Sequence, residues 1–100
     1  MKVTLLGAGH IGQTIARLLH GSGDYRVRVL DKNDTALAHL RAEGITTVQV
    51  DSEDHDALAR AVRADGGSDA IVNALPYHLA IPAARIALEA GCHYFDLTED

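Results

Sequence analysis

The sequence predicts an α/β domain in which a doubly wound parallel sheet of five strands, in the order 3-2-1-4-5, is covered by four helices. Two observations lead to this prediction. Five short runs of apolar and β-branched residues alternate with longer amphipathic stretches, which is the pattern of repeated βαβ units. The glycine-rich turn Gly7-Ala-Gly-His-Ile-Gly12 follows the first run, where right-handed crossovers place the ligand-binding edge of such a sheet. A chain of 100 residues has room for one such domain.

The predicted strands and helices alternate along the chain, with no internal repeat, linker or low-complexity segment between them. Each helical stretch stops at glycine, which readily adopts the left-handed conformation found after a helix C-cap. In chain order, the predicted elements are strand 2–6, helix 10–20, strand 26–31, helix 35–43, strand 46–50, a helix from 52 to the glycines at 66–67, strand 70–73, helix 78–90 and strand 93–97.

Individual residues support these boundaries. Asn33 or Asp34 is the expected N-cap of the second helix, and Ser52 that of the third, because short polar side chains accept hydrogen bonds from the first turn. In strand 26–31, arginine and valine alternate as in a half-exposed strand, with the valines and Leu30 on the buried side.

The glycine turn has the GxGxxG spacing of a dinucleotide-binding loop. Gly7 allows the tight turn off the strand, Gly9 lets the backbone approach a pyrophosphate, and Gly12 lets the helix pack close to the sheet. The first turn of the helix presents unpaired N–H groups, with His10 contributing its backbone rather than its ring, and Ile11 beside it. A strand before the loop and a helix after it are typical of a Rossmann-type fold and favour dinucleotide binding over a merely structural turn.

Asp31 ends the second strand roughly 20 positions after Gly12, where a ribose-binding acid is expected. A carboxylate there accepts hydrogen bonds from the ribose hydroxyls and repels a 2′-phosphate, which favours NAD over NADP. Lys32 could partly neutralise a 2′-phosphate, but the acid occupies the diagnostic position. The alternative role of Asp31 is to cap the helix that follows.

Two further segments reach the same edge of the sheet. Asp51 ends the third strand and is expected either to approach the adenine or to cap the next helix together with Ser52. After the fourth strand, Pro76 pushes Leu75 toward an extended conformation, which leaves the amide of Asn73 and nearby backbone groups able to face a nicotinamide ribose. The predicted cofactor-binding residues are Gly7, Gly9, His10, Ile11, Gly12, Asp31, Lys32, Asp51, Asn73, Ala74, Leu75 and Pro76.

Composition excludes several other functions. A net charge of −5 with nine scattered Lys and Arg residues argues against a nucleic-acid surface. No apolar run is long enough to span a bilayer, and the N-terminus lacks a signal-peptide layout. Cys92 is the single cysteine, so no intramolecular disulfide forms, and a reducing cytoplasm is the simplest setting.

Motifs for other chemistry are also missing. The six histidines show no metal-ligand spacing, so we expect no metal site. No Ser/His/Asp or Cys/His set is placed for nucleophilic catalysis, and no GxxxxGK[ST] loop indicates nucleotide hydrolysis.

Three segments together resemble the NAD(P)-binding domain of the saccharopine dehydrogenase-like family. They are the glycine loop with its strand (3–12), the run Ile-Val-Asn-Ala-Leu-Pro that ends and follows the fourth strand (71–76), and the run Gly-Cys-His-Tyr-Phe-Asp-Leu-Thr with its flanking residues (90–99). The second and third are more selective than the first. The resemblance implies an oxidoreductase that moves hydride between a nicotinamide cofactor and a carbon bearing an amino group.

By this resemblance, residues 1–100 are the dinucleotide-binding domain of a longer enzyme, and its substrate-binding and proton-transfer residues lie beyond position 100. No catalytic residue is therefore assigned, although Thr98 and Glu99 match the family's segment near the active-site cleft. We expect the isolated chain to bind NAD weakly and to catalyse nothing.

A regulatory nucleotide-binding module of the RCK potassium-transport type is the competing interpretation. Such modules share the glycine-loop opening and the acids after the second and third strands, but tend to carry acidic, polar residues after the fourth. Here Asn73-Ala-Leu-Pro76 and an alanine-rich helix follow the fourth strand, which favours the dehydrogenase. A stand-alone domain that binds nucleotide weakly or not at all is a third alternative.

The expected partners are the dinucleotide cofactor and a missing C-terminal substrate domain. Without that companion, helix 78–90 and strand 93–97 are expected to expose apolar surface, which favours self-association. We therefore expect a homodimer or a crystal contact on this surface.

Overall fold

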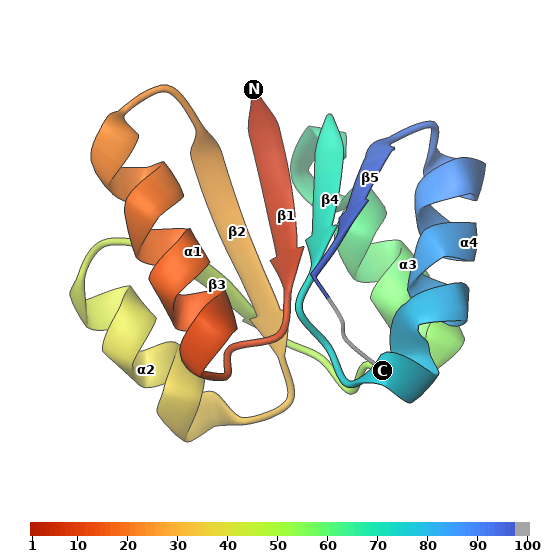
Figure 1. The fold of residues 1–100 in the computed structure, drawn as a ribbon, viewed down its shortest axis with the longest axis horizontal. Helices are drawn as coiled ribbons and strands as arrows, with labels where there is room; N and C mark the ends of the chain where they lie inside the picture. Colours follow the sequence, from red (N-terminus) through yellow and green to blue (C-terminus); the bar gives the residue numbers. More distant parts are fainter. Residues whose placement is uncertain (98–100) are drawn as a thin grey trace.

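A computed structural model of the chain describes residues 1–97, which form a five-stranded parallel sheet with helices on both faces (Figure 1). The strands are β1 (Lys2–Leu6), β2 (Arg26–Asp31), β3 (Thr46–Gln49), β4 (Ala70–Asn73) and β5 (His93–Asp96), in the order β3-β2-β1-β4-β5. The helices are α1 (His10–Ser22), α2 (Asp34–Ala42), α3 (His55–Arg63) and α4 (Ala80–Ala90), with short 3₁₀ turns η1 (Ala64–Gly66) and η2 (Tyr77–Leu79). The predicted α/β fold and its strand order are confirmed.

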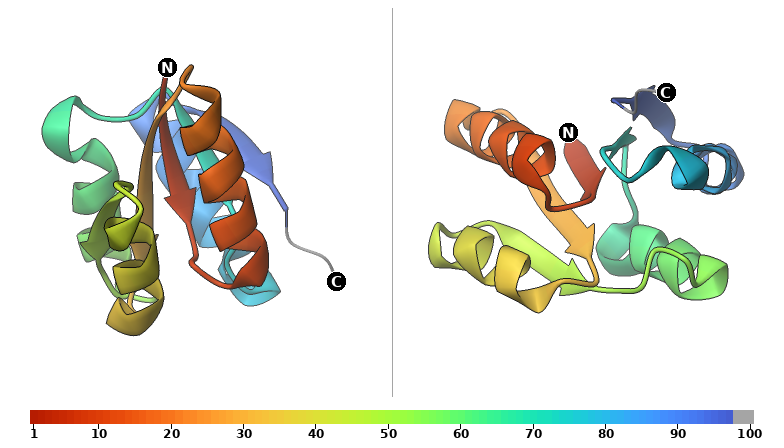
Figure 2. Two further views of the ribbon diagram at one scale, coloured as in Figure 1. Left: turned by 90° about the vertical axis from the view of Figure 1, so that its left-hand side faces the viewer. Right: turned by 60° about the horizontal axis from the view of Figure 1, so that its bottom comes forward.

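The sheet separates two apolar cores. Helices α1 and α2 cover one face, and α3 and α4 cover the opposite face (Figure 2). Leu5 of β1 packs into the first core and its neighbour Leu6 into the second, because successive side chains of a strand point to opposite faces. Both leucines are fully buried, so both faces of β1 are covered by helices, as in other parallel sheets.

The start of α3 differs from the prediction. Ser52 is not its N-cap, because the carboxylate of Asp54 accepts the hydrogen bond from the N–H of Ala57 at 3.1 Å. Before this cap the chain makes a turn, in which the carboxylate of Asp51 accepts a hydrogen bond from the N–H of Glu53 at 3.0 Å. The helix therefore begins later than the sequence indicated.

Other boundaries differ by a few residues. The predicted helix 78–90 is divided into η2 and α4, and β3 and β5 each end one residue early. Helix α1 extends to Ser22 and ends at Gly23, whose φ of 79° is the left-handed conformation expected of a C-terminal glycine.

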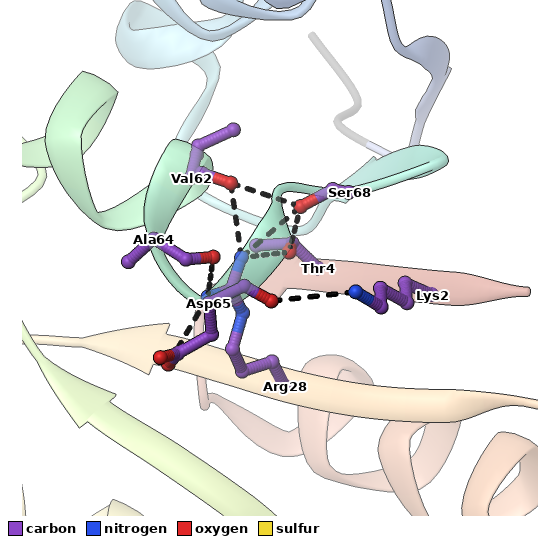
Figure 3. Close-up of polar contacts among 7 residues, drawn as sticks. All are labelled: Lys2, Thr4, Arg28, Val62, Ala64, Asp65 and Ser68. Atoms are coloured by element: carbon purple, nitrogen blue, oxygen red, sulfur yellow. Dashed lines mark hydrogen bonds and ion pairs between the residues drawn. The ribbon is translucent and has the colours of Figure 1, made fainter.

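Arg28, in the middle of β2, is buried, although the Arg/Val alternation indicated a half-exposed strand. Its side chain reaches under the end of α3 (Figure 3), and the residue is 9% exposed. The guanidinium donates to the carbonyl oxygens of Val62 (3.0 Å) and Ala64 (2.9 Å), and to the hydroxyls of Thr4 and Ser68 (both 3.1 Å). Carbonyls at a helix end lack intrahelical donors, so this cation closes the negative end of α3.

Candidate functional site

The glycine loop packs tightly against its neighbours. Gly7 has a φ of 103°, a conformation that L side chains rarely adopt, and its N–H donates to the carbonyl of Leu30 at 2.9 Å. A Cβ atom on Gly7 would lie 2.8 Å from the carbonyl oxygen of Ala74, and one on Gly12 would overlap the carbonyl oxygen of Gly7. The two glycines thus let the segment after β4, the loop and α1 approach one another.

Helix α1 begins without a capping side chain. Its N-cap is Gly9, whereas α2 and α3 begin with Asn33 and Asp54, whose side chains accept hydrogen bonds from the first turn. Apart from Gly9 and its two chain neighbours, no atom of the described residues 1–97 lies within 4 Å of the position that a Cβ of Gly9 would take, and the first turn of α1 contains no acidic residue. The N–H groups of that turn therefore have no side-chain cap at the positive end of the helix dipole, an arrangement that suits a phosphate.

The Asp31 carboxylate is fixed beside this helix terminus. One of its oxygens accepts a hydrogen bond from the N–H of Ala8 at 2.6 Å, and the other accepts one from the N–H of Asn33 at 2.8 Å. Each carboxylate oxygen can accept a further hydrogen bond, so the group retains capacity for ribose hydroxyls. The N-cap of α2 is Asn33, so Asp31 orders the turn before that helix rather than capping it.

These elements border one cleft of about 520 Å³ at the carboxyl ends of the strands. Gly7, Gly9 and Ile11 form one wall with Asp31 beside them, and the opposite wall is the segment from Ala74 to Tyr77. Leu97, just after β5, completes the lining. The structure thus brings most of the predicted binding residues together.

Two lining residues were not among those predicted to bind the cofactor. Tyr77 directly follows the predicted segment and is 62% exposed, and Leu97 was assigned to the end of the last strand. The available signal was topological, because the carboxyl ends of all five parallel strands meet at this edge of the sheet.

Four other predicted residues do not line the cleft. Gly12 packs beneath the loop, and His10 is exposed in the first turn of α1. Lys32 is exposed, and its carbonyl accepts a hydrogen bond from Gln49 at 3.1 Å. Asp51 is exposed and holds the turn before α3. Contacts of these residues with a ligand remain predictions.

Asn73 requires a correction. Its side chain was expected to face a nicotinamide ribose, but it is 0% exposed. Its Oδ1 accepts a hydrogen bond from the N–H of Leu75 and its Nδ2 donates to the hydroxyl of Tyr94, both at 3.1 Å. The amide is therefore turned inward by a partner on β5, and the segment after it forms the wall of the cleft.

Within residues 1–97, no cluster of three His, Cys, Asp or Glu side chains could hold a metal ion, and no helix is long and apolar enough to cross a membrane. Thr98 and Glu99, which match the family's segment near the active-site cleft, lie outside the described residues.

Comparison with known families assigns the chain. The sequence model of the family described as "Saccharopine dehydrogenase NADP binding domain" matches residues 3–99. The chain belongs to this family. It is therefore a nicotinamide-dinucleotide-binding domain with a Rossmann-type fold, in agreement with the three sequence segments.

Solved structures share this fold. Saccharopine dehydrogenase (L-Glu forming) from Saccharomyces cerevisiae has a TM-score of 0.81 and 24% identity over 95% of this chain, and the chain spans 21% of that protein. The TrkA-N domain of the inner membrane protein ybaL from Escherichia coli has a TM-score of 0.80 and 17% identity, over 99% of this chain and 73% of that one. BdcA from E. coli has a TM-score of 0.75 and 25% identity, over 95% and 60% of the two chains.

Proposed function

We propose that this domain holds NAD for an oxidoreductase of the saccharopine dehydrogenase type, which transfers hydride between the nicotinamide and a carbon bearing an amino group. The observation that carries the proposal is that three features border one cleft: the uncapped start of α1, the Asp31 carboxylate and the segment after β4. They suit the pyrophosphate, the adenosine ribose and the nicotinamide ribose in turn. The bound nicotinamide supplies the hydride chemistry, and the residues of this chain bind and orient it.

Asp31 supports NAD over NADP. Two backbone N–H groups hold its negative charge in place, where it can accept hydrogen bonds from ribose hydroxyls and would repel a 2′-phosphate. Lys32 is exposed, so solvent weakens any compensation by its charge. The family's description names NADP, so the preference for NAD rests on this carboxylate alone.

Residues 1–100 are proposed to act together with further protein. The chain spans 21% of the yeast enzyme, and a hydride-transfer enzyme also needs groups that bind its substrate. Ile81 and Leu88 of α4 and Phe95 of β5 are 75%, 80% and 57% exposed, and this apolar surface supports contact with a substrate domain or with a second copy. Light scattering that finds only monomer at high concentration would argue against the homodimer.

The regulatory module remains the second candidate. The TrkA-N domain of ybaL is nearly as similar in structure as the yeast enzyme and matches almost the whole of this chain. Against it, the cleft wall after β4 is apolar, with Ala74, Leu75 and Pro76, where such modules tend to be acidic.

Nuclear magnetic resonance titration of the isotope-labelled chain tests the proposed function. Addition of NAD⁺ should shift the amide signals of residues 7–12 and of Asp31, and NADP⁺ should cause smaller shifts at the same concentration. Undisturbed signals in the glycine loop would refute cofactor binding by this chain. Tighter binding of NADP⁺ would refute the cofactor preference alone.

A further inference from the structure

The β4–α4 segment, residues 74–79, is held at both ends by one pair of side chains, the buried Asn73 and the partly buried Tyr94. At its start, the Oδ1 atom of Asn73 accepts a hydrogen bond from the N–H of Leu75. Two backbone hydrogen bonds fix the chain at the same place. The carbonyl of Asn73 accepts one from the N–H of Leu97 at 2.9 Å, and the N–H of Ala74 donates one to the carbonyl of Leu6 at 2.8 Å. A fully buried amide is costly unless every partner is in place, so this geometry is strongly specified.

Tyr94 completes the arrangement from β5. Its hydroxyl accepts the hydrogen bond from Asn73 at 3.1 Å and lies 3.2 Å from the carbonyl oxygen of Ala80, the first residue of α4. The same hydroxyl lies 2.9 Å from a carboxylate oxygen of Asp96, and its single proton serves one of these two acceptors at a time. Burial raises the pKa of Tyr94 to about 12, so the hydroxyl keeps its proton at neutral pH. One hydroxyl thus links the start and the end of the segment.

The position of the segment has little freedom. Its residues Ala74 to Tyr77 form a wall of the cleft, and the carbonyl of Ala74 already lies against Gly7, where a Cβ would be only 2.8 Å away. No side chain would therefore fit between the segment and the glycine loop. Loss of its anchor would move it outward and widen the cleft.

We propose that Asn73 and Tyr94 are positioning residues for the nicotinamide half of the site. They set the distance between the β4–α4 segment and the glycine loop without touching the ligand themselves. This inference rests on the proposed function. The adenosine half, formed by Asp31 and the start of α1, is bonded to neither residue, so their loss acts on one half of the dinucleotide only.

Tyr94→Phe tests this inference, because it removes the hydroxyl and keeps the ring. Affinities of the 100-residue chain for NAD⁺ and for ADP, which lacks the nicotinamide ribose, are measured by calorimetry or resonance titration. Loss of one hydrogen-bonded hydroxyl should weaken NAD⁺ binding by roughly fivefold, and ADP binding should be unchanged. Normal ADP binding also shows that the variant is folded. The matched control, Tyr25→Phe before β2, should leave both affinities unchanged.

Asn73→Ala provides a second variant. It should reduce the ratio of NAD⁺ to ADP affinity in the same direction, and Tyr94→Phe added to it should reduce the ratio no further. Equal weakening of both ligands, or no weakening of either, would overturn the inference and leave the proposed function intact. A wild-type chain that binds neither ligand would overturn both, and one that binds NAD⁺ no more tightly than ADP would overturn the inference alone.

Discussion

Two helix termini at opposite ends of the sheet, the start of α1 and the end of α3, differ in whether their backbone groups have side-chain partners. At the carboxyl end, α1 begins at Gly9 with no side-chain cap and faces an open cleft of about 520 Å³. At the amino end, the carbonyls that finish α3 are bound by the buried guanidinium of Arg28. A second cavity of about 450 Å³ lies at that end. There Lys2 donates a hydrogen bond to the carbonyl of Asp65, and Arg28 donates one to the carbonyl of Ala64. The two cavities are therefore similar in volume. They differ in whether the backbone groups of the nearby helix terminus have side-chain partners.

The largest expected effect concerns Gly12. Gly12→Leu places a side chain against the carbonyl of Gly7, which is backbone and cannot give way, so α1 must separate from the loop. We expect a loss of about 3 kcal/mol or more in the free energy of unfolding, measured by thermal or urea denaturation. Gly9→Ala is the matched control, because its Cβ would enter open space. A wild-type melting temperature in Gly12→Leu would contradict the packing described at the carboxyl end.

Arg28 tests the amino end. Arg28→Met keeps much of the stem but leaves buried carbonyls and hydroxyls without their donor, which should cost about 2–4 kcal/mol of stability. Arg85→Met, at an exposed position of α4, is the control and should change little. Nucleotide affinity of the folded variant should match wild type. Wild-type stability together with weakened NAD⁺ binding in Arg28→Met would contradict the structural role assigned to Arg28 at the amino end.

Asp31 tests the proposed cofactor choice. Asp31→Ala should weaken NAD⁺ binding by about 1.5–3 kcal/mol, the range for hydrogen bonds to a charged group. The affinity for NADP⁺ should fall less, because the variant also lacks the negative charge that repels the 2′-phosphate. Asp24→Ala removes an equal charge near the amino end and should leave both affinities unchanged in calorimetric titrations. Unchanged affinity in Asp31→Ala would remove Asp31 from the site.

The smallest effect is a dependence of stability on pH, which is expected only at alkaline pH. Burial raises the pKa of Tyr94 from 10.0 to about 12, so the folded chain holds this proton more tightly than the unfolded chain. The corresponding stability is fully present below pH 10 and is lost as pH rises toward 12. Urea denaturation across this range should show a fall that is smaller in Tyr94→Phe. An identical fall in both chains would show that the Tyr94 hydroxyl is not held as described.

Much of the fold could be predicted because its signals are local. Apolar runs, glycine stops and the cap Asn33 depend on neighbours in sequence, and the topology rule then brings the glycine loop, Asp31 and the segment after β4 to one edge. Asn73 could be placed on that edge by the same rule. The direction of its side chain could not, because its partner Tyr94 lies on another strand.

The predictions for Arg28 and Ser52 failed for different physical reasons. The alternation along β2 indicates on which face of the sheet a residue lies. It does not show that the end of α3 covers Arg28, because this contact joins residues far apart in the sequence. Ser52 and Asp54 are both good N-caps, and the carboxylate of Asp51, which binds the N–H of Glu53, selects the later one.

The adjacent leucines of β1 constrain how this domain can change in length. Leu5 and Leu6 belong to different cores, so one residue inserted into β1 would send every following side chain of the strand to the wrong face. The same insertion would displace Gly7 and the start of α1. Insertions and deletions are therefore expected in the connections at the amino end, such as residues 23–25 between α1 and β2, while the opposite edge is expected to vary by substitution only.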